Sequence, residues 1–258
     1  MPKYDTLNPY RYSLTTRIKE SKLLKQMNAS EGEMILDLGC GMGYFSDKMR
    51  EKGATCIGLD LSLPSLQYAN EKWPGEHIIG FCNKIPFRDS TFDKVLFTDV
   101  IEHMEDDESS LMEIARVLKP SGYVVITTPA KAGLLVGTKL NLLFHDKPGT
   151  PEYHYRIGYT AGELSEKFKK CGIETVAVRY TTTFFGEVFT ELLKLLYSLM
   201  ETDFETQADS RSIGNSWIFK VYRYLFFPIL FSISKVEDIL LSRFIKGHLL
   251  LVKGKAIK

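Results

Sequence analysis

The amino-acid sequence predicts a doubly wound α/β domain, in which helices cover both faces of a mostly parallel sheet. Short apolar runs that resemble buried strands alternate with amphipathic stretches of helical period along the 258 residues. The run 34–38 passes into a turn with three glycines and then into residues that can form a helix. The next apolar run, 54–59, ends on Asp60. A strand, a glycine-rich turn and a helix make the first unit of a nucleotide-binding sheet.

The glycine-rich turn carries chemical information beyond its fold. Residues 35–46 read I-L-D-L-G-C-G-M-G-Y-F-S. Glycine lets the backbone bend tightly and approach a ligand, and the N-terminus of the following helix offers unpaired N–H groups. A dinucleotide fingerprint requires a third glycine where this chain has Tyr44, and Asp37 would repel a pyrophosphate. The acid would instead suit a ligand with a cationic amine.

The remaining elements follow in order between recognisable start and stop signals. Ser62 is a good N-cap for a helix over 64–72, and Thr160 with Glu163 forms a capping box for a helix over 160–170. The tetrapeptide K-P-S-G at 119–122 stops an amphipathic helix over 109–118. An N-terminal helix is expected over 14–27. Further strands are expected over 76–81, 94–98, 123–128, 173–180 and 248–257.

Two stretches carry a family resemblance. The string D-x-G-x-G-x-G from Asp37 to Gly43 resembles motif I of the class I S-adenosylmethionine (SAM) dependent methyltransferases. Residues 82–104, C-N-K-I-P-F-R-D-S-T-F-D-K-V-L-F-T-D-V-I-E-H-M, are similar to the middle of that family. The resemblance implies a Rossmann-like sheet of seven strands in the order 3-2-1-4-5-7-6, with strand seven antiparallel. It places the SAM-binding domain over 1–182 and 247–258.

The resemblance also implies which residues hold SAM and its product S-adenosylhomocysteine. Asp37 would face the amino-acid end, Asp60 would accept the ribose hydroxyls, and Leu61 would contact adenine. Family members usually carry an acid where this chain has Phe81, so Phe81 would stack or pack, with the backbone near Cys82 and Asn83 contacting the base. The full expected set is Arg11, Tyr12, Asp37, Gly39, Cys40, Gly41, Gly43, Tyr44, Asp60, Leu61, Phe81, Cys82, Asn83, Thr98 and Asp99.

The acceptor side is expected at the ends of strands four and five. The D-x-x-E-H arrangement of Asp99, Glu102 and His103 resembles the ubiquinone-biosynthesis O-methyltransferases, in which the matching positions are tied to a divalent metal. Two readings stay open: a metal site, which is not expected here, or a helix start with local pairing. An imidazole titrates near neutral pH and can remove a proton. His103, His154 and Tyr155 are therefore the catalytic candidates.

A helical insertion is predicted over 183–246, ahead of the last strand. Its first apolar pattern runs from Val188 to about 199, and its second from Trp217 to Val236, where Pro228 should kink or split the helix. The sequence leaves three interpretations open. The insertion is a helical cap, a homodimer interface, or a surface that contacts a membrane or closes over a lipophilic substrate.

Composition restricts the partners. The formal net charge is +1, which gives no argument for nucleic acid. Four cysteines without a C-x-x-C pair do not indicate a zinc site or a disulfide framework. The N-terminus lacks the apolar core of a signal peptide, and no apolar run approaches the roughly 20 residues of a membrane span. The expected location is cytoplasmic, with peripheral membrane contact left open.

Together these features predict a SAM-dependent methyltransferase that acts on oxygen or carbon of a small acceptor, with a lipophilic acceptor left open. No N-P-P-Y-type motif follows strand four, which argues against amino-methylation of nucleic-acid bases or glutamines. An NAD-dependent oxidoreductase and a SAM-binding protein without activity are the alternatives.

Overall fold

The computed structural model describes residues 14–131, 154–181, 188, 221–242 and 244–258. The chain divides into two compact units. One contains the sheet and consists of 23–180 and 247–258. The other consists of 1–22 and 181–246. The sequence predicts that 1–22 belongs to the sheet domain.

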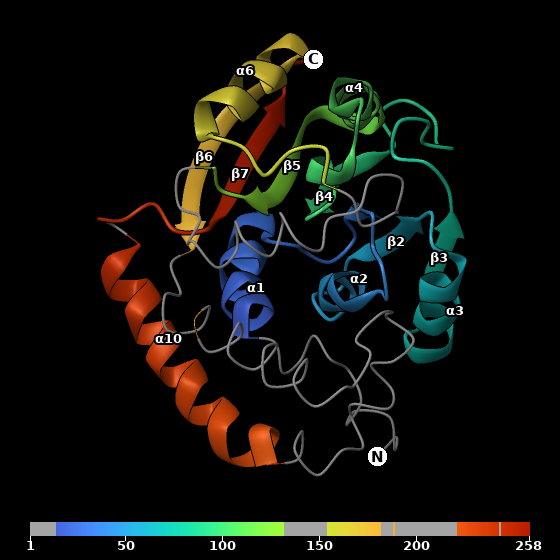
Figure 1. Cartoon of the computed structure of the whole chain (residues 1–258). Coiled ribbons are helices and arrows are strands. Elements are labelled where there is room, and N and C mark those ends of the chain that lie inside the picture. The colour runs from blue at the N-terminus through green and yellow to red at the C-terminus, as the bar shows by residue number, and fades with distance from the viewer. Residues whose placement is uncertain (1–13, 132–153, 182–187, 189–220, 243) are drawn as a thin grey trace. The chain divides into compact units, whose positions relative to one another are not determined.

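The sheet has the predicted seven strands in the predicted order, β3-β2-β1-β4-β5-β7-β6 (Figure 1). Strand β1 pairs in parallel with β2 and β4, and the pairs β2–β3 and β4–β5 are also parallel. Strand β7 runs antiparallel to β5, as expected. The strands are β1 Met34–Leu38, β2 Thr55–Asp60, β3 Glu76–Ile79, β4 Phe92–Thr98, β5 Leu118–Pro129, β6 Ile173–Thr181 and β7 Leu249–Ala256.

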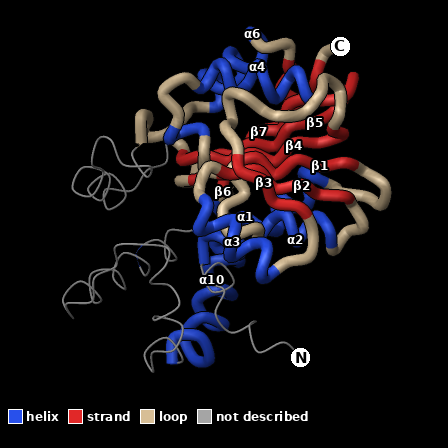
Figure 2. The backbone as a smooth tube through the Cα atoms, turned by 90° about the vertical axis from the view of Figure 1, so that its right-hand side faces the viewer, coloured by secondary structure: helices blue, strands red, loops and turns tan. Residues whose placement is uncertain are grey.

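Helices cover both faces of this sheet, with α2 and α3 on one side and α4 and α6 on the other (Figure 2). Their starts follow the local signals. The Ser62 hydroxyl caps α3, and Thr160 and Glu163 form both halves of the capping box of α6. The helices are α1 Leu14–Met27, α2 Tyr44–Arg50, α3 Leu63–Lys72, α4 Asp107–Val117 and α6 Ala161–Lys170.

Helix α4 and strand β5 both begin earlier than predicted. Helix α4 begins at Asp107 rather than 109, because the Asp106 carboxylate caps it by accepting the Ser109 N–H at 3.1 Å. Strand β5 begins at Leu118 rather than 123. Leu118 pairs with Phe92 before a register shift, so the K-P-S-G segment that ends the helix lies inside a strand.

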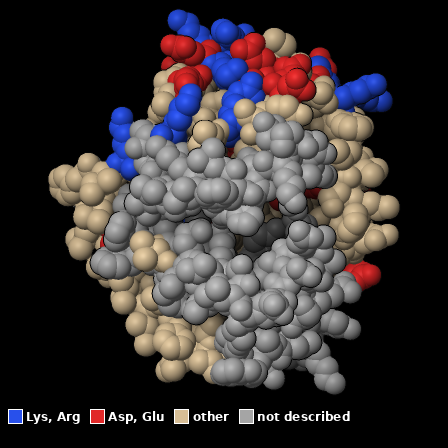
Figure 3. All heavy atoms as spheres, in the orientation of Figure 1, with Lys and Arg blue, Asp and Glu red and all other residues tan. Residues whose placement is uncertain are grey.

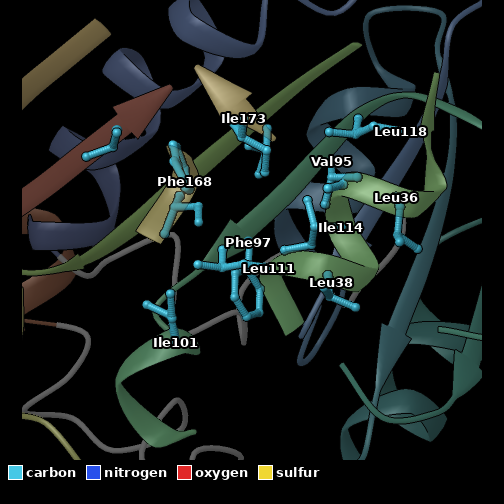
Figure 4. Packing of buried hydrophobic residues seen from close by; sticks show 14 of the residues in the cluster. Leu36, Leu38, Val95, Phe97, Ile101, Leu111, Ile114, Leu118, Phe168 and Ile173 are labelled. Atoms are coloured by element: carbon cyan, nitrogen blue, oxygen red, sulfur yellow. The ribbon is translucent and has the colours of Figure 1, made fainter. Parts of the chain in front are cut away.

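The core lies between the central strands and the α4–α6 face. Leu36, Leu38, Val95 and Phe97 of β1 and β4 are buried in one cluster with residues of α4 and with Phe168 of α6 (Figure 4). Parallel strands covered on both faces read as continuous apolar runs, which is why these two were recognisable in the sequence. The core fixes the carboxyl ends of β1 and β4 side by side, with Leu38 opposite Phe97.

The outer surface over α4 and α6 carries both signs of charge (Figure 3). Lys167 Nζ lies 2.9 Å from Asp107 Oδ1 and 3.1 Å from Glu108 Oε1, and Lys170 Nζ lies 3.3 Å from the same Glu108 oxygen. Interleaved charges give this face no field of a single sign, in agreement with the composition.

The described part of the insertion is mainly one continuous helix, which is π-helical at its start and α-helical after that. A π-helical turn, η3 Tyr222–Phe226, leads directly into α10 Phe227–Leu241. Pro228 stands at this junction, where the missing proline N–H is tolerated in the first turn. Except for Val188, the first predicted helix of the insertion lies outside the described residues. None of the described helices combines the length and the apolar character that crossing a bilayer requires.

Candidate cofactor and acceptor site

The glycine turn is the best-defined part of the site. Gly39, Gly41 and Gly43 all have positive φ, at 70°, 51° and 76°. The N–H groups of Gly39 and Cys40 donate to the Leu59 carbonyl at 2.7 and 3.1 Å, which ties the turn to β2. Burial, chiefly, raises the pKa of the Cys40 thiol far above its usual range, so this side chain stays neutral within the turn.

Gly39 is also where the turn meets the end of β4. A Cβ on Gly39 would lie 2.3 Å from Cγ2 of Val100, which is too close for any real contact. Val100 therefore packs directly against the turn. The glycine turn and the segment that follows β4 form one continuous edge of the sheet.

Substitution of Gly39 with alanine is expected to destabilise the fold and abolish cofactor binding. Gly32 is the matched control, because its φ is +80° but nothing lies within 4 Å of its Cβ position. Gly32→Ala should cost about 1–2 kcal/mol of unfolding free energy from the backbone alone. Gly39→Ala should cost about 1–3 kcal/mol more through overpacking on Val100. Urea unfolding measures both, and equal losses would contradict the close contact.

Asp37 is buried two residues ahead of the turn. Its Oδ2 accepts the Ser46 hydroxyl at 2.6 Å. Its Oδ1 is buried and receives no hydrogen bond from the part of the chain that the structure describes. The pKa of Asp37 is raised to about 6, chiefly by burial; the Ser46 hydrogen bond opposes this rise and repulsion from Asp60 adds to it. A buried carboxylate oxygen that lacks a donor fits a cationic ligand group or an ordered water at this place.

Asp60 stands at the end of β2 and faces the same turn. Its two oxygens accept the N–H groups of Gly41 at 2.7 Å and Ser62 at 2.8 Å. A carboxylate oxygen has two lone pairs, so each retains one acceptor position for a hydroxyl. The Gly80 N–H donates to the Asp60 carbonyl at 3.0 Å and holds the end of β3 beside it.

Apolar side chains flank Asp60. Leu61 and Phe81 are each 57% exposed. Phe81 forms an isolated bridge with Lys84, so its backbone is fixed. Burial raises the pKa of Cys82 to about 12, and Asn83 is exposed. This arrangement leaves two apolar side chains beside Asp60 on which a flat ring can pack.

Two of the remaining predicted cofactor residues, Thr98 and Tyr44, are buried. Thr98 is buried at the end of β4. Tyr44 is buried as the first residue of α2 and packs edge-to-face on Phe45, with ring centroids 5.2 Å apart. Arg11 and Tyr12 lie outside the described residues.

Asp99 is held by β5 rather than joined to Glu102 and His103. Its φ is 52°, its N–H donates to the Thr127 carbonyl at 2.8 Å, and its Oδ1 accepts the Thr127 hydroxyl at 2.8 Å. The cluster that does form consists of Glu102, His103 and His154, whose ligand atoms lie within 4.8 Å of one another. Among the described residues, His154 rather than Asp99 belongs to this group with Glu102 and His103.

The His103–His154 pair is compact and partly exposed. The two ring centroids are 4.2 Å apart at an interplanar angle of 43°. Glu102 is buried, and its Oε2 accepts the Thr128 hydroxyl at 3.1 Å. Ile101–His103 form a single 3₁₀ turn, so the expected helix start is only one turn long. A buried carboxylate with two imidazoles can take up a proton or hold a divalent cation.

Arg156 and Tyr159 fix the segment that carries His154. The Arg156 N–H donates to the Glu102 carbonyl at 3.2 Å, and its guanidinium donates to the carbonyls of Met104 and Glu105. The buried Tyr159 donates its hydroxyl to Asp107 at 2.5 Å. The sequence placed this segment at the cofactor edge but gave no signal for Asp107, which holds it there through Tyr159. It gave none for Thr127 and Thr128, which hold Asp99 and Glu102.

Fold and site agree with the family that the sequence resembles. The strand order with an antiparallel seventh strand, the three-glycine turn after β1 and the acid at the end of β2 are all present. Residues 36–126 match the family described as "Methyltransferase domain". This match runs from β1 to β5, including the glycine turn and the acid at the end of β2.

Known proteins resemble the chain over part of its length. A malonyl-[acyl-carrier protein] O-methyltransferase of Serratia marcescens is 32% identical over 114 residues, 44% of this chain and 45% of that protein. A demethylmenaquinone methyltransferase of Renibacterium salmoninarum is 29% identical over 126 residues, 48% of this chain and 53% of that protein. The chain spans about half the length of these curated relatives.

The fold has solved counterparts over nearly the whole chain. A SAM-dependent methyltransferase from Archaeoglobus fulgidus superimposes with a TM-score of 0.58. The comparison covers 93% of both chains at 16% identity. At this identity the likeness shows the fold, including the seven-stranded sheet, and not the acceptor.

Proposed function

We propose that the chain transfers the methyl group of SAM to an oxygen or carbon nucleophile of a small acceptor with an apolar portion. One observation carries the proposal: Asp37 is buried beside the glycine turn with one oxygen that receives no donor from the described residues. An unsatisfied buried carboxylate oxygen is costly, and a cationic amino group offsets that cost. The amino-acid end of SAM has such a group.

The other contacts of the donor are assigned to residues around the same turn. Asp60 retains acceptor positions for the two ribose hydroxyls, and the half-exposed Leu61 and Phe81 flank the adenine ring. The bare backbone of Gly39 and Gly41 lets the donor approach without a Cβ in the way. Bound SAM supplies a methyl group already activated by its sulfonium.

With the methyl group already activated, the protein needs to align the acceptor, exclude water and manage one proton. The pair His103 and His154 takes up the acceptor proton. The Glu102 carboxylate beside the pair stabilises the resulting imidazolium, and the Thr128 hydroxyl orients this carboxylate. Val100 lies between this pair and the glycine turn, so donor and base share one edge of the sheet.

The acceptor class follows from the surroundings of the histidine pair. Tyr155 and Ile157, on the segment that carries His154, are 49% and 50% exposed. Exposed apolar side chains next to a base suit a molecule with an apolar body and one ionisable group. The related proteins act, by their names, on a malonyl group and on demethylmenaquinone. A lipophilic phenol, quinol or carboxylic acid is the acceptor type proposed.

Calorimetry separates this proposal from its alternatives. The purified protein is expected to bind S-adenosylhomocysteine with micromolar or tighter affinity and to show no measurable heat with NAD⁺. Binding of NAD⁺ in its place would favour an oxidoreductase. Transfer of labelled methyl from SAM to a panel of lipophilic phenols, quinols and carboxylic acids then tests activity. Tight binding without any methylated product across the panel would favour a SAM-binding protein without activity.

A further inference from the structure

The described helix of the insertion is amphipathic, but its polar side is buried and its apolar side is exposed. Its buried face carries Ser234, Glu237 and Asp238, and Asp238 forms an ion pair with Lys22 of α1 at 2.6 Å. Its outward face carries a row of apolar side chains, each between 41% and 85% exposed. This row, the apolar stripe, consists of Val221, Leu225, Ile229, Ile233, Val236, Leu240 and Phe244.

The stripe is long, regular and concentrated. Its members from Val221 to Leu240 recur every three or four residues, so they lie along one side of the helix, and Phe244 follows in the turn after the helix ends. From Val221 to Leu240 it spans about 30 Å at about 1.5 Å per residue. Eleven of the 21 large hydrophobic side chains that are exposed in the described residues fall between 221 and 245. A continuous apolar patch of this kind indicates contact with an apolar partner.

The charges of the same segment select among partners. Between 221 and 246 both acids, Glu237 and Asp238, are buried. The other charged side chains among the described residues of this segment are basic: Lys235 and Lys246 are exposed, and Arg223 is half-buried. The sequence adds a fourth base, Arg243. An apolar face bordered by basic groups alone is the arrangement of helices that lie in the surface of an anionic bilayer.

A second copy of the chain is less favoured as the occupant. An isologous contact places the same patch on both subunits, so it would bring the basic side chains of two copies together. The buried acids cannot answer them, because Asp238 already pairs with Lys22. Anionic headgroups neutralise these basic charges, and the apolar stripe is buried at the boundary between headgroups and acyl chains.

We propose that residues 221–246 form a peripheral membrane anchor whose apolar stripe inserts into the surface of an anionic lipid bilayer. The lysine and arginine stems extend along the stripe while their charged ends reach the headgroups. The proposal rests on the insertion alone and does not depend on the proposed methyl transfer.

Vesicle co-sedimentation of the full chain tests the anchor. The protein should bind vesicles that contain phosphatidylglycerol and bind pure phosphatidylcholine vesicles at least about tenfold more weakly, because the basic border loses its counter-charge. Ile233→Asp with Leu240→Asp should weaken binding to the anionic vesicles by at least about tenfold. Met112→Asp, at a similarly exposed apolar position on α4, is the matched control and should leave binding unchanged.

A charge-reversal variant tests the electrostatic part of the anchor separately from the apolar part. Lys235→Glu should weaken binding to phosphatidylglycerol vesicles by about tenfold and leave the weak binding to phosphatidylcholine unchanged. Circular dichroism and S-adenosylhomocysteine binding report whether each variant is folded. The anchor is overturned if the native chain does not bind phosphatidylglycerol vesicles, or if the stripe variant binds as the native chain does. It is also overturned if the lipid-free protein is a dimer that the stripe variant dissociates.

Discussion

Replacing Asp37 with asparagine is expected to remove most of the affinity for S-adenosylhomocysteine and, at the same time, to stabilise the ligand-free protein at neutral pH. The two effects share one cause. Burial holds the pKa of Asp37 near 6, so at pH 7 and above the protein carries a buried charge that receives one side-chain hydrogen bond, from Ser46. That charge costs stability and gains its compensation only when a cation binds.

The direction of the stability change follows from proton linkage. The pKa of Asp37 rises from 3.8 to about 6 on folding, so the folded state keeps a proton that the unfolded chain has already lost. The stability from this group is complete below about pH 4 and is lost as the pH rises through about 6. An asparagine side chain carries no charge, so Asp37→Asn should gain about 2 kcal/mol of unfolding free energy at pH 8 and little at pH 4.

Ligand binding should change in the opposite direction. A charge-assisted hydrogen bond contributes about 1.5–3 kcal/mol, so Asp37→Asn should weaken S-adenosylhomocysteine binding by roughly 10- to 100-fold at pH 8. The affinity of the native protein should fall as the pH drops below about 6, and that of the variant should not.

Asp89→Asn removes the same charge at an exposed position and controls for net charge. Urea unfolding and calorimetry between pH 4 and pH 8 measure both quantities. An affinity that is indifferent to Asp37→Asn would remove the central support of the proposed function.

Local signals in the sequence were sufficient for the individual elements of the fold and for the glycine turn. The strand before Gly39, the acid at Asp60 and the capping box at Thr160 are each complete within a few residues, so their structure follows from their neighbours in sequence. The sheet order required more, because strand pairing joins residues that are far apart. It followed from the family resemblance.

Contacts between distant segments were beyond the sequence. The partner of Asp37 is the Ser46 hydroxyl, and nothing in the glycine motif identifies it. Asp99 looked like part of the cluster because it precedes Glu102 by three residues. Its left-handed backbone and the Thr127 hydroxyl hold its carboxylate on β5 instead. His154 lies beside Glu102 and His103. A hydrogen bond from the Arg156 N–H to the Glu102 carbonyl joins its segment to theirs.

The insertion shows a different limit. Its apolar periodicity predicts a helix, and a helix forms, but periodicity does not say which face turns inward. Burial of Asp238 against Lys22 reverses the usual choice and leaves the apolar face outside. An ion pair across more than two hundred positions decides this, and such a pair cannot be recognised from one sequence.

Replacing His103 with glutamine is expected to slow methyl transfer to phenols by roughly 10²- to 10⁴-fold, the usual contribution of a positioned base. The effect should depend on the acceptor. A phenol keeps its proton at pH 7 and needs the base, whereas a carboxylic acid has already lost its proton and needs only alignment. The loss with carboxylic acids should therefore be at most a few-fold, and S-adenosylhomocysteine affinity should change little.

The same contrast distinguishes a base from a metal ligand. A metal held by Glu102, His103 and His154 would orient either acceptor oxygen, so its loss would slow phenols and carboxylic acids alike, and a chelator would reproduce the effect on the native enzyme. A base predicts a chelator-insensitive enzyme and a selective defect.

His154→Gln should resemble His103→Gln, and the double variant should be hardly worse than either one, because the rings lie 4.2 Å apart and act as a unit. His248→Gln, outside the cluster, is the control. Steady-state rates with matched phenol and carboxylic acid acceptors decide the matter: equal losses for the two classes would rule out the base, since a carboxylate has no proton for it to remove.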